Sequence, residues 1–261
     1  MNIEEVRKVA DKQFEELVSA LEKGQSEGLK AYLGAMSKLY KYSFRNANLI
    51  FSQRPGATNV AGFMAWKSQG RFVKKGEKGI AIIVPHVIQS GESGLEKSSE
   101  VRGFRAKFVF DVSQTEGAAI PEIAKASGDP GTYLIALREY VAFKGIKLEV
   151  KPALGGADGS SSGGVITLRE GLNPAEEFSV LVHELAHELL HQGPARATRQ
   201  VMETEAEAVS SVVSGAIGLS SHGAAADYIQ LYSGCAETLK ASLEAIQVTA
   251  AGILEALLPS S

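Results

Sequence analysis

Two histidines and one glutamate stand at the spacing of a hydrolytic metal site. His183-Glu184-Leu185-Ala186-His187 is an H-E-x-x-H pentapeptide. Residues four apart share one face of a helix, so the two imidazoles can bind the same metal ion. Glu184 would then lie beside the metal, where a carboxylate can take a proton from bound water. The pattern predicts metal-assisted hydrolysis, with Zn2+ as the expected ion.

The chemistry requires this pentapeptide to lie inside a helix that is anchored in a core. Asn173-Pro174-Ala175-Glu176 has the residue types of an N-cap, a first-turn proline and a capping-box glutamate. Apolar residues then recur at helical spacing through Leu190, and Gly193-Pro194 should end the helix. The motif therefore falls in mid-helix. The alternative is a solvated helix that carries two surface histidines.

A catalytic zinc needs three protein ligands and an open position. We expect the third ligand on a second helix, over Thr198–Ile217, which carries Glu203, Glu205 and Glu207. Glu203 and Glu207 share a face, so we predict that Glu203 is the ligand and that Glu207 orients a ligating imidazole. The alternative ligand is Glu207. Glu205 points away from both and is expected to face solvent.

Three further residues, one beside the motif and two later in the chain, are weaker candidates for roles at the site. His191 follows His187 by four residues but lies one turn too far to join the same ion, so we interpret it as a helix C-terminal histidine. A tetrahedral oxyanion needs a donor besides the metal, and Tyr228 and His222 are the candidates. Of these two residues, we predict that Tyr228 is catalytic.

Composition is that of an ordinary globular protein, with 44% hydrophobic and 22% charged residues. The sequence has no apolar run of the ~18 residues that a membrane span needs, and its first residues lack the pattern of a signal peptide. Cys235 is the single cysteine, which excludes an internal disulfide. We therefore expect a cytoplasmic protein with no membrane partner.

The net charge of −3 conceals a strong asymmetry along the chain. Residues 36–81 carry nine cations and one acid, whereas residues 153–261 carry four cations and thirteen acids. Aromatic and amide residues are interleaved with the cations, which is typical of surfaces that stack bases and track phosphates of single strands. A solvated basic face is the alternative. The predicted DNA-binding residues are Tyr42, Arg45, Asn46, Asn48, Arg54, Trp66, Lys67, Arg71, Phe72, Lys74, Lys75 and Lys78.

Not every aromatic residue of this segment should contact DNA. Phe51 and Phe63 are expected in the core, while Trp66, Phe72 and Tyr42 are the preferred stacking residues. The segment has neither helix-turn-helix nor zinc-finger spacing, so readout of a specific duplex sequence is not predicted.

Several motifs resemble those of one known family. Asn46-Ala47-Asn48-Leu49-Ile50, the string Ala57-Thr58-Asn59-Val60-Ala61-Gly62-Phe63, the string Gly70 to Gly79, and Val109 to Gly117 resemble the N-terminal single-stranded-DNA-binding domain of ArdC-type antirestriction proteins. The H-E-L-A-H motif, Glu203 to Glu207 and Asp227-Tyr228-Ile229 resemble the zincin-like metallopeptidase domain of that family. The similarity covers nearly all of the chain after about Leu33.

The resemblance implies an α+β protein with two domains. Residues 1–125 would form an α+β domain that binds single-stranded DNA, and residues 126–261 a mostly helical zincin-like domain with a small sheet. Val165 to Leu168 is expected as a strand along which a peptide could add. The protein would protect incoming mobile DNA from restriction and hydrolyse peptide bonds of a protein substrate that the residues do not specify.

Two alternative functions fit the same residues. In one, the protein only coats single-stranded DNA and its metal site is structural. In the other, it is a regulatory peptidase that cleaves a repressor. Glu184 favours retained chemistry, because a structural metal site needs no base beside the ion.

Overall fold

The computed structural model describes residues 3–90, 98–119, 128–192, 197–219, 231–232 and 234–258. The chain divides into two compact units. Unit 1 consists of Met1–Glu16 and Arg45–Ile120, and unit 2 consists of Leu17–Phe44 and Pro121–Ser261. Leu17–Phe44 therefore pack with the C-terminal residues of the chain. Helix and strand occur in both units, which makes the fold α+β, as predicted.

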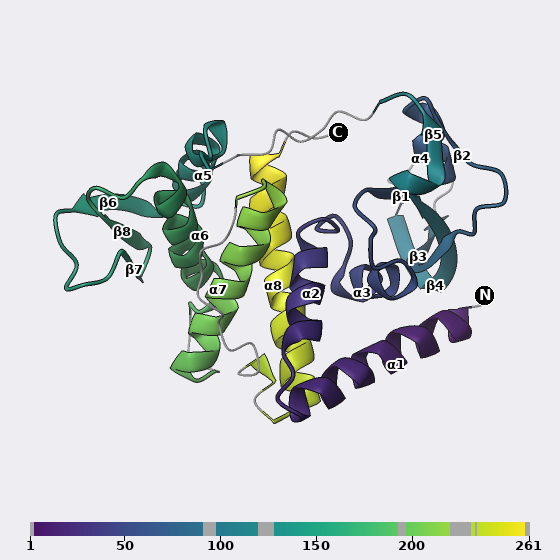
Figure 1. The fold of residues 1–261 in the computed structure, drawn as a ribbon, viewed down its shortest axis with the longest axis horizontal. Coiled ribbons are helices and arrows are strands. Elements are labelled where there is room, and N and C mark those ends of the chain that lie inside the picture. The colour runs from purple at the N-terminus through teal and green to yellow at the C-terminus, as the bar shows by residue number, and fades with distance from the viewer. Residues whose placement is uncertain are drawn as a thin grey trace. The chain divides into compact units, whose positions relative to one another are not determined.

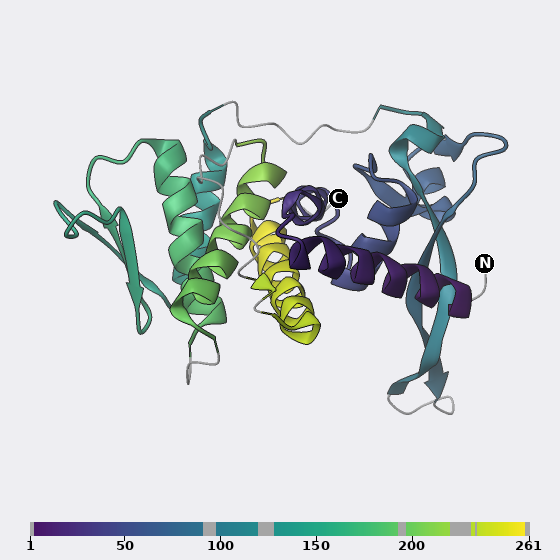
Figure 2. The same cartoon turned by 60° about the horizontal axis from the view of Figure 1, so that its bottom comes forward.

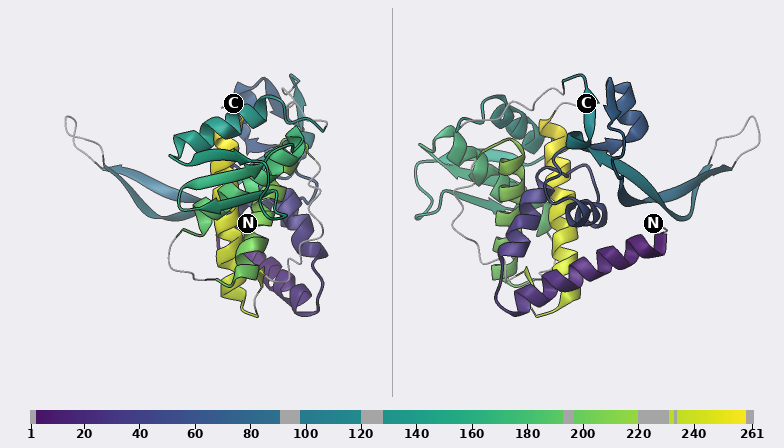
Figure 3. Two further views of the ribbon diagram at one scale, coloured as in Figure 1. Left: turned by 90° about the vertical axis from the view of Figure 1, so that its left-hand side faces the viewer. Right: turned by 45° about the vertical axis from the view of Figure 1, so that its right-hand side comes forward.

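Unit 1 is built around an antiparallel sheet of order β1-β4-β3 (Figure 1). Its elements are the first part of α1 (Ile3–Glu22), most of α3 (Phe44–Gln53), β1 (Val60–Gly62), α4 (Phe63–Ser68), β2 (Arg71–Val73), β3 (Ile80–Ser90), β4 (Ser98–Asp111), the 3-10 turn η1 (Val112–Gln114) and β5 (Thr115–Gly117). Strands β2 and β5 form a second, two-stranded sheet. Figures 2 and 3 show β3 and β4 continuing as a long two-stranded ribbon.

The small core of unit 1 lies between α1, α3 and this sheet. It contains Val6 and Ala10 from α1, Leu49 from α3, and Ala81 and Ile83 from β3. Strand β3 is an edge of the sheet, yet two amide side chains of α3 bond its backbone. Asn46 pairs with both backbone groups of Ile83 at 2.8–2.9 Å. Gln53, two turns later, pairs in the same way with Ala81 at 2.9 Å. Helix α3 therefore occupies the side of β3 where another strand would pair.

Asp111 and Gln114 hold the loops of unit 1 together. The Asp111 carboxylate accepts hydrogen bonds from the backbone of Thr58 at 2.8 Å and Asn59 at 3.2 Å, and from Ser113. Burial opposes ionisation of Asp111, but these hydrogen bonds outweigh it and lower the pKa of the carboxyl group. The Gln114 amide donates to Glu77 and to the carbonyl of Lys78, each at 2.8 Å. The turn that carries the lysines is thereby tied to the end of β4.

Unit 2 is a helical layer with a small sheet on one side. Its helices are α2 (Glu27–Met36), α5 (Thr132–Phe143), α6 (Pro174–Leu190), α7 (Arg199–Ala216) and α8 (Ala236–Leu257), and its strands are β6 (Lys147–Lys151), β7 (Gly159–Ser162) and β8 (Val165–Arg169). Helix α7 lies among α6, α8 and α2 (Figure 1). The sheet has the order β6-β8-β7, with β6 parallel and β7 antiparallel to β8. Helix α6 contacts β7 and β8.

Helix α6 begins as the sequence predicts. The Asn173 side chain accepts from the backbone of Ala175 and Glu176 at 3.0 Å, and Glu176 accepts in return from the Asn173 backbone at 3.0 Å. Phe178, Leu181 and Leu185 are fully buried. Because the apolar stripe fixes the rotation of α6, the remaining face of the helix presents the two motif histidines to α7.

The strand predicted at Val165 to Leu168 is present as β8, but its role differs from the expectation. Strand β8 is paired on both sides, by β6 and β7, and so has no free edge for a peptide. The free edge beside α6 belongs to β7. Within the described ranges, no helix has the length and apolar character to cross a bilayer.

Candidate metal centre and nucleic-acid surface

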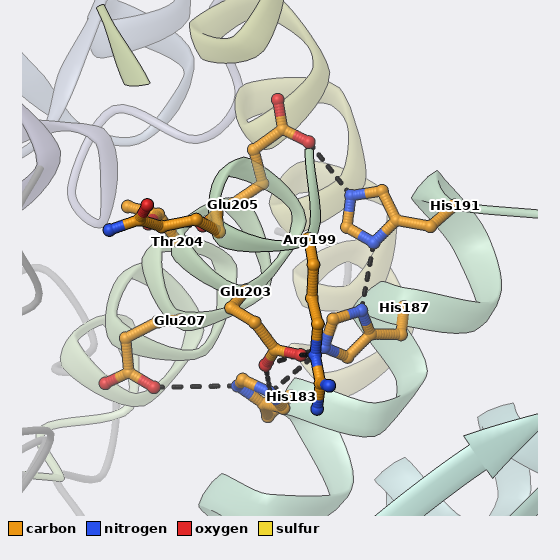
Figure 4. Close-up of polar contacts among 9 residues, drawn as sticks. His183, His187, His191, Arg199, Glu203, Thr204, Glu205 and Glu207 are labelled. Atoms are coloured by element: carbon orange, nitrogen blue, oxygen red, sulfur yellow. Dashed lines mark hydrogen bonds and ion pairs between the residues drawn. The ribbon is translucent and has the colours of Figure 1, made fainter. Parts of the chain in front are cut away.

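Three side chains from two helices converge on one point in unit 2. His183 Nε2 and His187 Nε2, from α6, lie 3.1 Å apart. Glu203 Oε2, from α7, lies 3.5 Å from the first of these atoms and 3.4 Å from the second. Figure 4 shows Glu203 reaching from α7 to both rings. Among the described residues, these three form the one cluster of histidine, cysteine and acidic side chains whose ligand atoms all lie within 4.8 Å of one another.

These separations fit a tetrahedral metal ion. Ligand bonds of about 2.0–2.1 Å at tetrahedral angles place two ligand atoms about 3.3 Å apart. The three observed separations, 3.1, 3.4 and 3.5 Å, lie close to that value. Two imidazoles and one carboxylate are also a donor set that suits zinc. The geometry thus places Glu203, rather than Glu207, beside both Nε2 atoms.

Glu184 lies on the sheet side of α6. Its carboxylate is hydrogen-bonded by the Ser161 side chain of β7. A Cβ atom on Gly159, the first residue of β7, would lie 2.8 Å from Glu184 Oε1 and 2.6 Å from Val180 Cγ1. Burial raises the pKa of Glu184. Strand β7 therefore packs so closely on α6 that only glycine fits opposite this carboxylate.

The second ring nitrogen of each histidine has its own partner. His183 Nδ1 lies 3.5 Å from Glu207 Oε2. His187 Nδ1 lies 3.0 Å from His191 Nδ1, and His191 Nε2 lies 2.9 Å from Glu205 Oε2 (Figure 4). Glu207 therefore lies beside the outer nitrogen of His183.

The placement of Glu205 corrects the expectation of a solvent-facing residue. Its side chain is only 11% exposed. The opposite face of α7 packs on α8, where Ser242 donates to Glu205 Oε1 at 2.5 Å, so this helix has no solvated acidic face at that position. His191 is also more than a helix-terminal residue, because its ring contacts both His187 and Glu205. Its i, i+4 spacing from His187 was the signal that could have revealed the contact.

The surroundings give the two motif histidines different acidities. Burial opposes protonation of His183, but its hydrogen bond to Glu207 and the charges of Glu184, Glu207 and Glu203 raise its pKa. Burial and the neighbouring His183 lower the pKa of His187. His187 therefore favours the neutral form that binds metals. Tyr228 and His222, the candidate oxyanion donors, lie outside the described residues.

Three of the predicted DNA-binding residues of unit 1 serve the fold instead. Trp66 is fully buried, and its Nε1 donates to the Phe110 carbonyl at 2.8 Å. The stacking role predicted for Trp66 is wrong, because the short helix α4 packs this ring inward. The Asn46 amide is engaged with Ile83, as described above. The Arg71 guanidinium donates to the Thr115 hydroxyl at 2.8 Å and to the carbonyls of Thr115 and Ala118.

Most of the other predicted residues are accessible. The exposed cations are Arg45, Lys67, Lys74, Lys75 and Lys78, and the half-buried residues are Asn48 and Arg54. Phe72 is 54% exposed, and Phe63, which was expected in the core, is 51% exposed. Phe63 and Trp66 thus exchange the roles that were expected of them. Tyr42 is half-buried, and it belongs to the segment that packs in unit 2.

The structure adds residues to this surface that the sequence window omitted. Arg102, Arg105 and Lys107 are exposed on β4, together with Phe104 and Phe108. The alternation of aromatic and basic residues along β4 was a signal for them. Near the lysine turn, a hollow of about 550 Å³ is lined by residues that include Arg54 and Lys78. Unit 1 therefore presents cations and aromatic rings on both α4-β2 and β4.

Comparisons with known proteins identify relatives of both units. Residues 4–110 match a family model described as the N-terminal domain of anti-restriction factor ArdC. The chain is 25% identical to the uncharacterized protein pXO2-81 of Bacillus anthracis over 275 residues, which cover 87% of this chain and 46% of that protein. The chain thus spans about half the length of this relative.

Two crystal structures of the antirestriction protein ArdC from the R388 plasmid share the fold. The metal-free structure has a TM-score of 0.54 at 15% identity and covers 95% of this chain and 97% of its own. The Mn(II)-bound structure has a TM-score of 0.54 at 14% identity and covers 97% and 99%. The fold of nearly the whole chain is therefore that of these two structures.

Proposed function

We propose that the chain, an ArdC-type antirestriction protein by its N-terminal domain and its fold, is a zinc-dependent peptidase that also binds single-stranded DNA. The observation that carries the proposal is the spacing of His183 Nε2, His187 Nε2 and Glu203 Oε2, which lie 3.1–3.5 Å apart. These three residues would hold the metal ion. A divalent ion bound there supplies a Lewis acid, which polarises a carbonyl oxygen and acidifies bound water.

Glu184 is the proposed general base. Its carboxylate would accept a proton from the attacking water at one oxygen and deliver it to the leaving amine. The hydrogen bond from Ser161 holds the carboxylate in place, and burial raises its pKa, which makes the carboxylate a stronger base. A site that served only to stabilise the fold would have no use for a buried base so placed.

The peptide substrate would lie along β7. This strand is the edge of the sheet β6-β8-β7, and its first residue lies against Glu184. An extended peptide can add to such an edge through backbone hydrogen bonds. The substrate class that fits is therefore an extended segment of a protein, and not a folded surface.

Single-stranded DNA would bind unit 1. The exposed Lys67, Lys74, Lys75 and Lys78 suit phosphates, and the exposed rings of Phe63 and Phe72 suit bases. The turn with three of these lysines is held by Gln114, which limits the entropy lost when DNA binds. Binding of this kind would shield incoming mobile DNA and bring proteins on that DNA to the peptidase.

The proposal is tested by an assay for cleavage of the protein itself and of DNA-binding proteins, with and without single-stranded DNA. We expect zinc-dependent cleavage that a chelator abolishes and that Glu184→Gln lowers by about 10²–10⁴-fold, since the base is lost. Glu184→Gln should still bind Zn2+, because Glu184 is not one of the three ligands.

Two results would redirect the proposal. Tight, salt-sensitive DNA binding without any cleavage would support a DNA-coating protein with a structural metal site. Cleavage of one repressor that does not depend on the lysines of unit 1 would support a regulatory peptidase.

A further inference from the structure

A chain of buried polar side chains runs from the proposed metal ligand His187 into the interior of unit 2. His187 Nδ1 lies 3.0 Å from His191 Nδ1, His191 Nε2 lies 2.9 Å from Glu205 Oε2, and Ser242 Oγ donates to Glu205 Oε1 at 2.5 Å. His191 and Glu205 have side chains that are only 10% and 11% exposed. This series of hydrogen bonds connects α6, α7 and α8.

The hydrogen-bond roles along this chain are determined once Nε2 of His187 binds a metal. A neutral imidazole that ligates through Nε2 carries its proton on Nδ1, so His187 must donate to His191. His191 Nδ1 is then the acceptor, and its proton resides on Nε2, which donates to the Glu205 carboxylate. The second carboxylate oxygen accepts from Ser242. Each of these donors then faces an acceptor.

We propose that His191 and Glu205 are positioning residues that fix the tautomer and the ring orientation of His187. This inference rests on the metal site of the proposed function. A carboxylate or carbonyl usually contacts a metal-bound histidine directly. Here a second histidine lies between them, because Glu205 points toward α8 and His191 bridges the distance.

The outer nitrogens of the two proposed imidazole ligands therefore have hydrogen-bond partners that differ in solvent exposure. His183 Nδ1 has Glu207 at 3.5 Å, and the Glu207 side chain is 29% exposed. The His187 side is nearly closed to solvent, and its partners are His191 at the C-cap of α6, Glu205 on α7 and Ser242 on α8. Water can replace a partner of His183 more easily than a partner of His187, so His187 should be the ligand with the more rigid orientation.

His191 is not a fourth ligand of the same ion. Its Nδ1 faces Nδ1 of His187, on the opposite side of that ring from the Nε2 atom that meets His183 and Glu203. Its Nε2 is engaged with Glu205. Both nitrogen atoms of His191 are thus occupied by the hydrogen-bond chain.

The test measures Zn2+ affinity of the full chain by competition with a chromophoric chelator. His191→Phe keeps an aromatic ring but removes both nitrogens, and we expect it to weaken Zn2+ binding by about 10–100-fold. His191→Asn, which keeps a short polar group near Nδ1, should recover part of that loss. The matched control is Ser210→Ala, which removes a partly buried hydrogen bond from α7 to the Ser179 carbonyl of α6 and leaves the His187–His191–Glu205 hydrogen bonds intact. It should leave Zn2+ affinity within about twofold.

A second measurement uses the unmutated protein and so does not depend on folding of the variants. Nitrogen-15 NMR of the Zn2+-loaded protein should show the His191 ring proton on Nε2 and the His187 ring proton on Nδ1. Equal Zn2+ affinity of His191→Phe and the unmutated chain, or a proton on His191 Nδ1, would overturn the proposal. Neither measurement depends on peptidase activity. A protein that shows both expected results but cleaves no peptide would therefore refute the proposed function and leave this inference standing.

Discussion

At the scale of single residues, Gly159 packs directly against Glu184, the proposed general base. A Cβ atom there would lie 2.6 Å from Val180 Cγ1 and 2.8 Å from Glu184 Oε1. Gly159→Ala must therefore move β7 or the Glu184 carboxylate, and shifts of this kind typically cost about 1–3 kcal/mol in well-packed sites. We expect peptide hydrolysis to fall at least tenfold, since about 1 Å of misplacement is costly to catalysis.

The control for this prediction is Ser160→Ala, because Ser160 follows Gly159 on β7 and is exposed. Zn2+ affinity measured beside kcat separates the two possible effects. Unchanged hydrolysis by a folded Gly159→Ala protein would show that the Glu184 carboxylate does not need this close contact.

At the scale of elements, the edge of β3 illustrates how a helix can complete a sheet. Asn46 and Gln53 each bond one residue of β3 through both amide groups. Asn46→Ala should expose the N–H and C=O of Ile83, at a cost of about 1–3 kcal/mol in the free energy of unfolding. Hydrogen exchange at the Ile83 amide should accelerate, which measures the opening directly.

The matched control is Asn48→Ala, on the same helix. Asn48 is half-buried, and among the residues that the structure describes it makes no hydrogen bond to β3. If both variants lost the same stability, the effect would belong to helix α3 in general, and the amide pairing with the strand would not explain it.

Elements with a local signal could be predicted from the sequence, whereas features set by tertiary packing could not. The capping box at Asn173 and the apolar stripe through Leu185 determine α6, and with it the position of the two histidines. The i, i+4 spacing of Glu203 and Glu207 also predicted their common face. Trp66 and Glu205 were misjudged because their burial depends on β4 and on α8, which lie far away in the sequence.

At the scale of the whole molecule, charge is divided between the two units in the way that the proposed function requires. The exposed lysines of the turn after β2 belong to unit 1, and the metal-binding residues belong to unit 2. A triple variant, Lys67→Ala, Lys75→Ala and Lys78→Ala, removes three cations that could contact phosphates. It should weaken binding of single-stranded DNA for all sequences alike, because phosphates carry no sequence information.

The salt dependence of binding gives this prediction a quantitative form. Each lost phosphate contact should reduce the slope of log Kobs against log salt by about 0.7 for single strands, so three contacts should reduce it by about 2. The matched control removes three cations from unit 2, in Lys144→Ala, Lys147→Ala and Lys240→Ala, and so changes the net charge equally. If the control reduced the slope as much as the unit 1 variant, binding would respond only to total charge. A reduction confined to the unit 1 variant, with unchanged Zn2+ affinity, would assign DNA binding and metal binding to separate units of the chain.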